Sequence, residues 1–258
     1  MITLGLLRGK IEIRQFLRQR ESVVFTLLFP LILMAIFGSV FTGKIAYGVT
    51  FSQYFLAGMI ATGLVNSGFQ QLAINIPMER DDGSLKRLRG TPMPVASYFI
   101  GKTILVLASI FFQVFFLLLG GLLFFKIHMP ASPEKWGILA GVMFLGTAGS
   151  TALGTAFSII PKSGRGASAT VTPLVIVLQF FSGVFFVFTQ LPTWMQQISS
   201  LFPLKWLCQG IRSVFLPDAF AKNEVARSWE TGKTFLVLSI WLVIGLVISI
   251  RWFKWDRA

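Results

Sequence analysis

Six stretches without a single charged side chain run through this chain of 258 residues. A transmembrane α-helix needs about 20 consecutive, mostly apolar residues to cross the hydrocarbon core of a bilayer. Five of the stretches reach that length, and the last one reaches it when the charged ends of Arg251 and Lys254 extend to the interface. The stretches are 22–43, 45–78, 103–125, 136–161, 166–204 and 234–250. They predict an all-α integral membrane protein with six transmembrane helices, organised as a single transmembrane domain over residues 1–258.

Two of these stretches are too long for one helix. In 45–78 we predict a span from Ser52 to Asn75, and in 166–204 a span from Ala167 to Phe188. The apolar residues from 189 onward then lie outside the spans, at one membrane face.

The composition supports a membrane protein, because 54% of the residues are hydrophobic, 13% are charged and the mean hydropathy is +0.74. Soluble domains carry about 25% charged residues. The formal net charge of +13 would also suit a nucleic-acid-binding protein. The basic residues, however, form short clusters between apolar stretches, which is typical of cytosolic membrane anchoring. We therefore expect contact with membrane lipid and no nucleic-acid partner. The one cysteine, Cys208, excludes an intramolecular disulfide.

Basic residues are concentrated in every second connecting segment. The N-terminal segment has five, 76–96 has four, 161–166 has Lys162 and Arg165, and the C-terminal tail has three, whereas 42–51 and 126–135 have one and two. Short loops rich in lysine and arginine face the cytosol. The sequence thus predicts a multi-pass protein of the plasma (inner) membrane with both termini cytosolic.

The two ends of the predicted bundle carry different additional segments. Residues 1–21 place Leu4, Leu7 and Ile11 on one stripe, which predicts an amphipathic interfacial helix on the inner leaflet. The external segment 189–233 begins too apolar for a solvated loop and predicts two short re-entrant helices, about 192–202 and 204–215, before the last span. The remainder, 217–233, is polar, and we expect it to be exposed. The hypothesis for the apolar part is an external gate formed by Pro192, Trp194, Phe202, Pro203 and Trp206.

The most charged stretch lies between the second and third apolar stretches, from residue 77 to residue 94. Three acids, Glu79, Asp81 and Asp82, are followed by Lys86, Arg87 and Arg89. Asp81 or Asp82 could cap a short helix that runs through Arg89 and is stopped by Gly90, Pro92 and Pro94. Basic residues in its last turn suit the helix dipole. We interpret this segment as a charged helix that the membrane domain presents to a partner in the cytosol.

Motifs for catalysis are weak. Gly38 to Lys44 matches the first seven places of a phosphate-binding loop, but Ile45 stands where a serine or threonine would hold magnesium. The one histidine, His128, has no cysteine, aspartate or glutamate at ligand spacing. We expect no catalytic residue, no metal site and no cofactor on this chain.

Uncharged polar residues within the spans have two interpretations. Asn66, Gln70, Gln113 and Gln179 either pair across helices or line a substrate path. The fourth stretch is rich in glycine and serine, which favours either close helix packing or a surface on which helices slide. The lack of charged residues in the spans favours cargo that is hydrophobic or amphipathic.

Two motifs resemble those of a known family. Residues Glu79 to Pro92 are similar to its acidic–basic–Gly–Thr–Leu…Leu…Thr–Pro segment between the second and third spans, with Ser84 where threonine is commoner. Residues Phe181 to Leu204 look like its fifth span and external helices, with Val187 where a proline is often found. In these motifs, and in span count and segment order, the chain resembles the ABC-2-type transporter permeases.

The resemblance implies a half-transporter that pairs with a second permease, the same or homologous. Two copies of a cytosolic ABC ATPase subunit would carry the ATP and magnesium. Lys162 and Arg165 would form a second cytosolic contact, and the N-terminal helix an interfacial elbow. The coupling residues would be Glu79, Arg80, Asp81, Asp82, Gly83, Leu85, Leu88, Thr91 and Pro92.

The predicted function is export of a drug, an antibiotic or a lipid-linked molecule, with ATP hydrolysis on the partner chain. Two alternatives remain open at this point. One is a non-catalytic membrane scaffold that recruits a cytosolic protein through the same loop. The other is a permease that exports polysaccharide.

Overall fold

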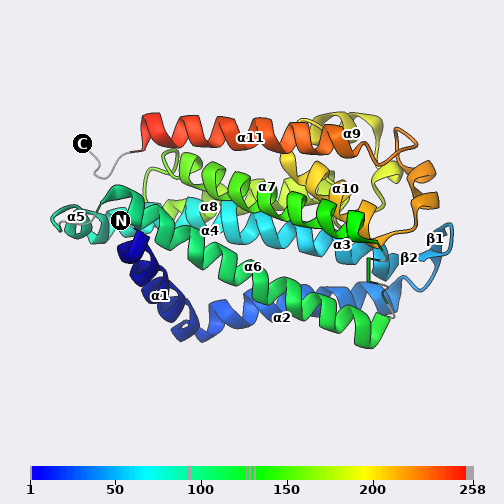
Figure 1. Cartoon of the computed structure of the whole chain (residues 1–258), viewed down its shortest axis with the longest axis horizontal. Helices are drawn as coiled ribbons and strands as arrows, with labels where there is room; N and C mark the ends of the chain where they lie inside the picture. The colour runs from blue at the N-terminus through cyan, green and yellow to red at the C-terminus, as the bar shows by residue number, and fades with distance from the viewer. Residues whose placement is uncertain (1, 92–93, 126, 128, 131, 254–258) are drawn as a thin grey trace.

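The computed structural model describes residues 2–91, 94–125, 127, 129–130 and 132–253. Pro92, His128, Lys254 and Arg257 therefore lie outside the described residues. The long helices run side by side along one axis (Figure 1). The start of α1, the short helix α5 and the end of α11 lie at one end of this bundle, and a small hairpin of β1 and β2 lies at the other. We refer to these as the α5 end and the hairpin end.

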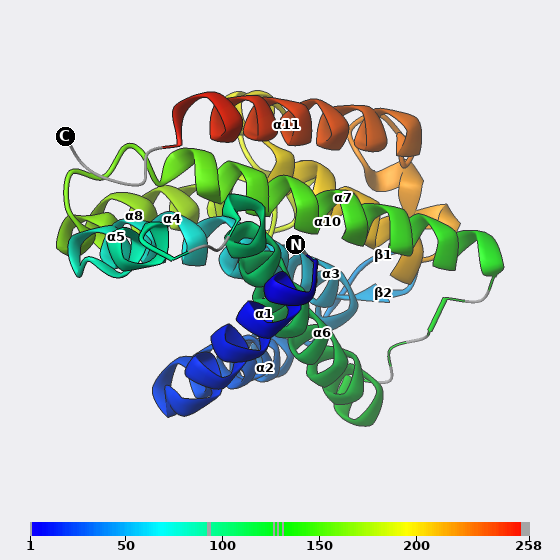
Figure 2. The ribbon, with the colours of Figure 1, turned by 60° about the vertical axis from the view of Figure 1, so that its left-hand side comes forward.

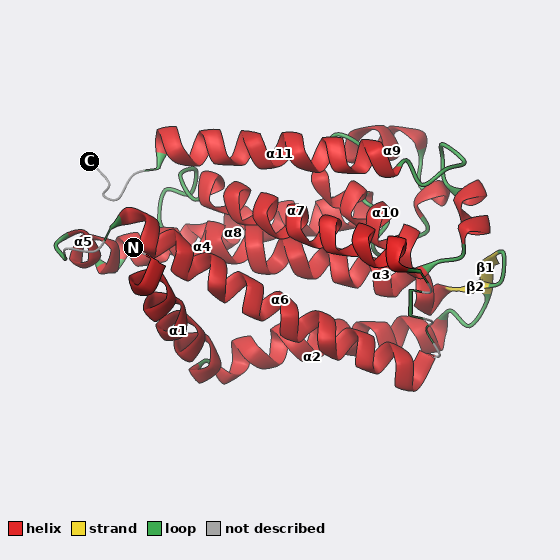
Figure 3. Ribbon diagram, viewed as in Figure 1, coloured by secondary structure: helices red, strands yellow, loops and turns green. Residues whose placement is uncertain are grey.

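Helices account for nearly all the regular structure of the described residues, as Figure 3 shows. The α-helices are α1 (Ile2–Arg18), α2 (Arg20–Val40), α3 (Phe51–Leu64), α4 (Gln71–Asp81), α5 (Ser84–Arg89), α6 (Val95–Phe125), α7 (Pro133–Phe157), α8 (Gly164–Phe181), α9 (Thr193–Ser199), α10 (Pro203–Phe215) and α11 (Thr231–Trp252). A π-helical segment, η1 (Val65–Gln70), joins α3 to α4, and η2 (Phe188–Gln190) and η3 (Asp218–Asn223) are 3₁₀ turns. The strands β1 (Lys44–Ala46) and β2 (Val49–Thr50) pair antiparallel.

Three described helices are long and apolar enough to cross a bilayer, namely Ala96–Phe125, Pro133–Phe157 and Thr231–Trp252. The all-α membrane fold is therefore confirmed. The other three predicted spans are helical as well: α2, the continuous α3–η1–α4 helix, and α8. That all six cross the membrane stays a prediction. The last span is longer than the charge-free stretch alone, because α11 runs from Thr231 to Trp252 and includes Arg251.

Helix α3 forms the centre of the core. Every residue from Tyr54 to Leu64 is buried, including Tyr54 at 1% exposure. Helix α10 packs against α3, α7 and α11 and is buried from Leu204 to Phe215. The two short helices predicted before the last span are thus present close to their predicted positions, as α9 and α10. Helix α10 is enclosed by the other helices, which explains why this segment is so apolar.

A second group of helices lies to one side of this core. Figure 2 shows α1, α2 and α6 together, away from α7 and α11. Helix α1 packs on α6 through Gly5 and Gly9, which face Ile100 and Ile104, and it also buries Glu12. Its apolar residues Leu4, Leu7 and Ile11 are exposed. The helix predicted over residues 1–21 is present, but it buries its small and charged side and exposes its apolar stripe.

The fifth predicted span is shorter than expected. Helix α8 ends at Phe181 rather than Phe188, and Gly183 adopts φ +72°, a left-handed conformation that glycine tolerates. The carbonyl of Gly183 accepts a hydrogen bond from Arg212, and the backbone N–H of Phe188 donates to the Tyr54 hydroxyl at 2.9 Å. Hydrogen bonds to α10 and α3 thus replace the helical ones.

The prediction that 217–233 is simply exposed is wrong in part. Phe220 is fully buried, and Glu224 is 6% exposed. The Phe220 ring packs against Tyr54 at 5.9 Å and Trp229 at 6.2 Å between ring centroids. This aromatic contact draws η3 onto the core, while the residues from Val225 to Ser228 remain exposed.

Close packing explains the small residues of α7. A Cβ on Gly154 would lie 2.6 Å from the carbonyl oxygens of Gly68 and Phe69, and a Cβ on Gly146 would lie 2.6 Å from side-chain atoms of Leu64 and Leu207. Small residues let membrane helices approach closely where no hydrophobic effect drives them together. The close-packing interpretation of this stripe is therefore confirmed.

Two glycine-to-alanine changes on α7 test this packing. Gly137 has open space around its missing Cβ, so Gly137→Ala should be neutral or should stabilise the helix by up to about 1 kcal/mol. Gly154→Ala should destabilise the protein by about 1–3 kcal/mol, because the methyl group overlaps the π segment. Thermal unfolding of the two variants in mild detergent measures both effects. Equal midpoints would contradict the packing role of Gly154.

Candidate functional site

The charged segment forms a helical hairpin at the α5 end. Helix α4 continues the second predicted span as far as Asp81, so Glu79 and Arg80 lie on this long helix rather than on a loop. Gly83 turns the chain with φ +76°, and α5 begins at Ser84. The N-cap of α5 is Gly83, without a side-chain cap, so the predicted aspartate cap is wrong; the Asp82 carboxylate, one residue earlier, accepts from the Ser84 N–H at 2.8 Å. The hydrogen bonds from Ser84 hold the pKa of the Asp82 carboxyl below its usual value.

Helix α5 has one apolar and one basic side. Leu85 is fully buried and Leu88 packs against the core, whereas Lys86, Arg87 and Arg89 are exposed. Gly90 ends the helix, and the Thr91 hydroxyl donates to the Leu88 carbonyl at 2.6 Å. The predicted helix with basic residues in its last turn is therefore present and presents those residues outward.

Asp81 and Arg80 of α4 also bind residues in and just before the segment 161–166, which is the second predicted cytosolic contact. The Asp81 carboxylate accepts from the Gly164 N–H at 2.5 Å, at the N-terminus of α8, where a negative charge suits the helix dipole. Arg80 donates to the Ser158 carbonyl at 3.2 Å. Lys162 and Arg165, on either side of this attachment, are exposed. The structure thus brings the two segments predicted as cytosolic contacts into one surface.

A buried group of charges lies beneath α5. The Lys102 ammonium, 2% exposed, is bonded to the carboxylates of Glu79 and of Glu12, the latter at 3.0 Å. The Tyr98 hydroxyl donates to Glu79 at 2.8 Å, and Arg8 pairs with Glu12 at 2.6 Å. These five residues join α1, α4 and α6, and we call them the Lys102 cluster.

The Lys102 cluster corrects two sequence-based predictions. Lys102 had marked the edge of an apolar stretch, yet it lies inside α6, so the helices of the bundle are not free of charge. The sequence interpretation presents the whole charged segment to a cytosolic partner, yet the Glu79 carboxylate, 20% exposed, is paired with Lys102 beneath α5. Helix α6 is about 46 Å long, whereas the hydrocarbon core is about 30 Å thick. The first turns of α6, and Lys102 with them, therefore fit the interface rather than the middle of the bilayer.

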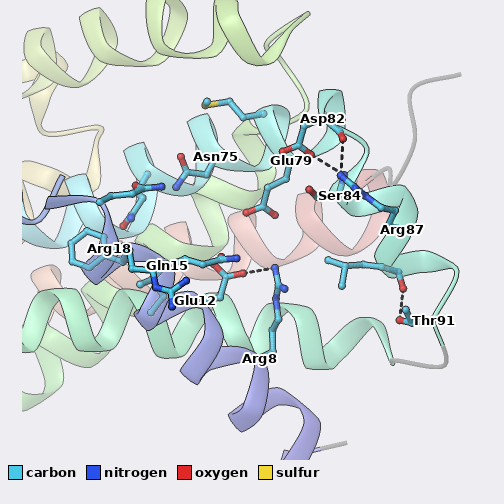
Figure 4. A pocket seen from close by; sticks show the side chains of 16 residues that line it. Arg8, Glu12, Gln15, Arg18, Asn75, Glu79, Asp82, Ser84, Arg87 and Thr91 are labelled. Atoms are coloured by element: carbon cyan, nitrogen blue, oxygen red, sulfur yellow. Dashed lines mark hydrogen bonds and ion pairs between the residues drawn. The ribbon is translucent and has the colours of Figure 1, made fainter. Parts of the chain in front are cut away.

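A polar cavity of about 720 Å³ opens between α1, α4, α5 and α6. Figure 4 shows Arg8 and Glu12 from α1 near Glu79 from α4, with Asp82, Ser84, Arg87 and Thr91 on the side of α5. Asn75, Gln15 and Arg18 complete its labelled wall. The lining combines charges of both signs with amides and hydroxyls, so it suits a polar protein segment better than an apolar ligand.

Comparison with known proteins agrees with this geometry. The family model described as ABC-2 type transporter matches residues 8–216, which is most of the chain. The chain belongs to the ABC-2 type transporter family. It is therefore a membrane permease of an ABC transporter, and this family implies an ABC ATPase as its partner.

Named relatives are distant but cover most of the permease. The transport permease ycf38 of Porphyra purpurea is 24% identical over 250 residues, covering 90% of this chain and 81% of the relative. YvfS of Bacillus subtilis, also named a transport permease, is 25% identical and covers 92% of both chains. The inner membrane transport permease YadH of Escherichia coli is 25% identical over 80% of each chain.

The polar amides of the permease contact neighbouring helices. Gln179 of α8 donates to Asn66 of η1 at 3.1 Å, and Gln70 donates to Thr172 at 3.2 Å. Gln113 of α6 is buried and lies directly against Gly63 of α3. These contacts account for the amides structurally, and their role in a substrate path stays a prediction.

The predicted gate residues of the permease do not form one surface. Pro192 precedes α9, and Trp194 is half exposed with its ring edge against Phe181, 5.5 Å between centroids. Pro203 begins α10, Phe202 stacks on Trp241, and Trp206 is buried and donates to the Ser200 carbonyl at 2.8 Å. Their gating function stays a prediction.

Sequence reasoning missed one further polar site near these residues. Lys205 and Arg212 of α10 are both buried, and burial lowers the pKa of Lys205 to about 8. The Lys205 ammonium lies 3.5 Å from the centre of the Trp206 ring, and the Arg212 guanidinium lies 3.8 Å from that of Tyr54. The sequence feature that could have revealed this site is the spacing of Lys205, Gln209 and Arg212, which places them on one side of an otherwise apolar helix.

The Lys102 cluster gives a prediction on stability. Lys102→Met should destabilise the permease by about 3–5 kcal/mol, because Glu79 would lose its paired cation while it stays close to Glu12, which keeps only Arg8. Thermal unfolding in detergent measures this, with exposed Lys86→Met as the matched control. The triple variant Lys102→Met, Glu12→Gln, Glu79→Gln should recover much of the loss. A single variant as stable as the control would show that the cluster does not hold these helices together.

Proposed function

We propose that this permease exports a hydrophobic or amphipathic compound, such as a drug, an antibiotic or a lipid-linked molecule. The observation that carries the proposal is the α4–α5 hairpin, which presents a basic surface while its other side is fixed to the bundle. The nature of the cargo is supported by the chemistry of the helices. Away from the Lys102 cluster and α10, the buried side chains of the described α-helices are mostly apolar, and the buried polar ones are uncharged hydroxyls and amides such as Thr62, Ser150 and Gln113.

The proposed assembly contains two permeases, the same or homologous, and two ABC ATPase subunits in the cytosol. Each permease would have six spans, with both termini and the α5 end on the cytosolic side of the plasma (inner) membrane. ATP and magnesium would bind to the ATPase subunits. Helix α5 would be the main contact with the ATPase, the exposed Lys162 and Arg165 a second one, and the polar cavity beside α5 would admit part of the partner.

The contacts of the hairpin support a coupling role. Helix α5 follows α4 through the short turn at Asp82 and Gly83. Helix α4 is tied to α6 and α1 by the Lys102 cluster and to α8 by the bond between Asp81 and Gly164. A push on α5 by the ATPase would therefore reach four helices at once. The spans would tilt, and a cavity between the two permeases would open to the outside.

The segment from Pro192 to Phe215 would gate the external end. Its support is the enclosure of α10 between α3, α7 and α11, since any tilt of those helices must displace α10. Crosslinking α10 to α3 through engineered cysteines should block export. Transport that continued at the normal rate with the crosslink formed would contradict the gate.

Affinity purification tests the proposed function as a whole. The tagged protein would be isolated in mild detergent, its partners identified by mass spectrometry, and ATPase activity measured with candidate lipids and drugs. We expect an ABC ATPase to co-purify and its hydrolysis to respond to some of these compounds. Recovery of a partner without ATPase activity would instead favour a membrane scaffold.

A charge-reversal variant tests the contact surface itself. Lys86 and Arg165 are exposed on the two segments that we assign to the ATPase contact. Lys86→Glu with Arg165→Glu should reduce the co-purified ATPase at least about tenfold, because like charges at an interface cost several kcal/mol. Thermal stability should not change, since neither side chain is buried. The matched control is Lys44→Glu with Lys222→Glu, which reverses two exposed charges outside the α5 end. Equal losses in both variants would contradict the assigned surface.

A further inference from the structure

The side chain of Lys205 is enclosed in the bundle without an ion pair. Lys205 is 6% exposed and lies in the first turn of α10, which packs against α3, α7 and α11. Its ammonium donates to the Oε1 atom of Gln209 and lies 3.5 Å from the centre of the Trp206 ring and 5.5 Å from that of Phe188. It forms no ion pair with any residue that the structure describes, whereas the buried Lys102 pairs with two carboxylates.

The enclosed charge is less stable than the same charge in water. One neutral amide and two aromatic rings offset only part of the hydration that an ammonium group loses on burial. Burial therefore lowers the pKa of Lys205 to about 8, although the carboxylates of Glu230 and Glu224 act in the opposite direction. The charges of Lys233 and Arg212 lower this pKa further. At neutral pH the amine is still mostly protonated, so α10 holds a charge for which water is the better solvent.

One side chain connects this charge to the start of α11. The Gln209 amide, which accepts from Lys205, also donates to two groups that precede α11. These are the Trp229 carbonyl at 2.9 Å and the Glu230 carboxylate at 3.4 Å. Glu230 adopts a left-handed conformation with φ 45°, which is unfavourable for a residue with a side chain. The amide thus joins the first turns of α10 to the start of α11 beside a strained residue.

The other end of α10 is held differently. Arg212 donates to the Gly183 carbonyl, and its guanidinium lies 3.8 Å from the centre of the Tyr54 ring. A guanidinium is more weakly hydrated than an ammonium, so it loses less on burial. The end of α10 near Lys205 therefore gains more from contact with water than the end near Arg212.

We propose that the buried Lys205 biases the first turns of α10 toward release from the bundle, with Gln209 as the latch and the bonds of Arg212 as the hinge. Release carries the ammonium into water and breaks its bond to Gln209. A neutral side chain at this position would hold α10 more tightly. The use of this bias to open a path for cargo rests on the proposed external gate, whereas the bias itself requires neither cargo nor ATPase.

The natural cysteine of the chain reports the release. Cys208 lies one turn after Lys205 and is fully buried, and burial raises the pKa of its thiol to about 11. Because the thiolate is the reactive form, Cys208 is inert while α10 is enclosed. Dilute iodoacetamide should alkylate it only when α10 opens. Intact mass spectrometry of the purified full chain in mild detergent measures the rate.

Comparison with Lys205→Met isolates the effect of the charge. In water the lysine regains an ordinary pKa of about 10.4, so the released state binds more protons, and release becomes less favourable as the pH rises through about 8. The rate for the natural protein divided by that for Lys205→Met should therefore fall at least about tenfold between about pH 7.5 and 9.5. Ionisation of the thiol cancels in this ratio, and the lost bond to Gln209 changes it equally at every pH.

Two controls complete the experiment. Lys233→Met removes an exposed ammonium from the same region, and the corresponding ratio should fall less than about threefold over this pH range. The variant Cys208→Ser with Ala73→Cys places the thiol at a fully buried position of α4. This thiol should react at least about tenfold more slowly than Cys208, because release of α10 leaves α4 in place.

Three results would overturn the proposal. The first is a ratio for Lys205→Met that does not fall as the pH rises. The second is an equal fall for Lys233→Met. The third is a Cys208 that reacts no faster than the cysteine of Ala73→Cys, since the whole bundle would then have to unfold. Crosslinking of α10 separately tests whether its release is needed for export, so the two failures are distinguishable.

Discussion

A single buried ammonium group determines how one end of this permease is built. Lys102 is almost completely removed from water, and removing a charge from water costs several kcal/mol unless partners compensate. The partners are Glu12 of α1 and Glu79 of α4. Helix α1 packs on α6 where Gly5 and Gly9 meet Ile100 and Ile104, and Glu12 adds a directed ion pair to this apolar contact. The ion pair therefore fixes α1 in place and sets the position of the α4–α5 hairpin beside it.

The hairpin end is held by a second buried cation. Arg212 of α10 is 1% exposed, donates to the Gly183 carbonyl and lies over the Tyr54 ring. Tyr54 in turn accepts from the backbone of Phe188. These bonds return the chain into the bundle after α8 ends, and they replace the helical hydrogen bonds that would otherwise be lost. In both places a charged side chain, which its hydropathy would place in water, is buried instead. Its bonds hold neighbouring helices together.

The sequence predicted the features that follow from local residue patterns. It missed those that depend on contacts between residues far apart in the chain. Each of the six apolar stretches contains a long helix, the small residues of α7 mark close packing, and α5 ends near its predicted residues. The Lys102 cluster was missed because its members lie 23 and 90 residues apart, and a charge next to an apolar stretch reads as its boundary. Burial of Phe220 and Glu224 was missed because the prediction used the overall polarity of residues 217–233, which does not reveal single residues that face inward. The coupling, path and gate roles of individual residues remain predictions.

The long helix from α3 through η1 to α4 connects two of the buried cations, Arg212 and Lys102. Tyr54 meets Arg212 near one end, Glu79 meets Lys102 near the other, and the helix is continuous over about 46 Å. Only the π segment, Val65–Gln70, departs from regular α-helical bonding, and such segments are places where helices deform. At that point Gly154 lies against the carbonyls of Gly68 and Phe69, so α7 restricts sideways bending. In the proposed coupling, a displacement at the α5 end would reach Tyr54 and α10 through this one continuous helix.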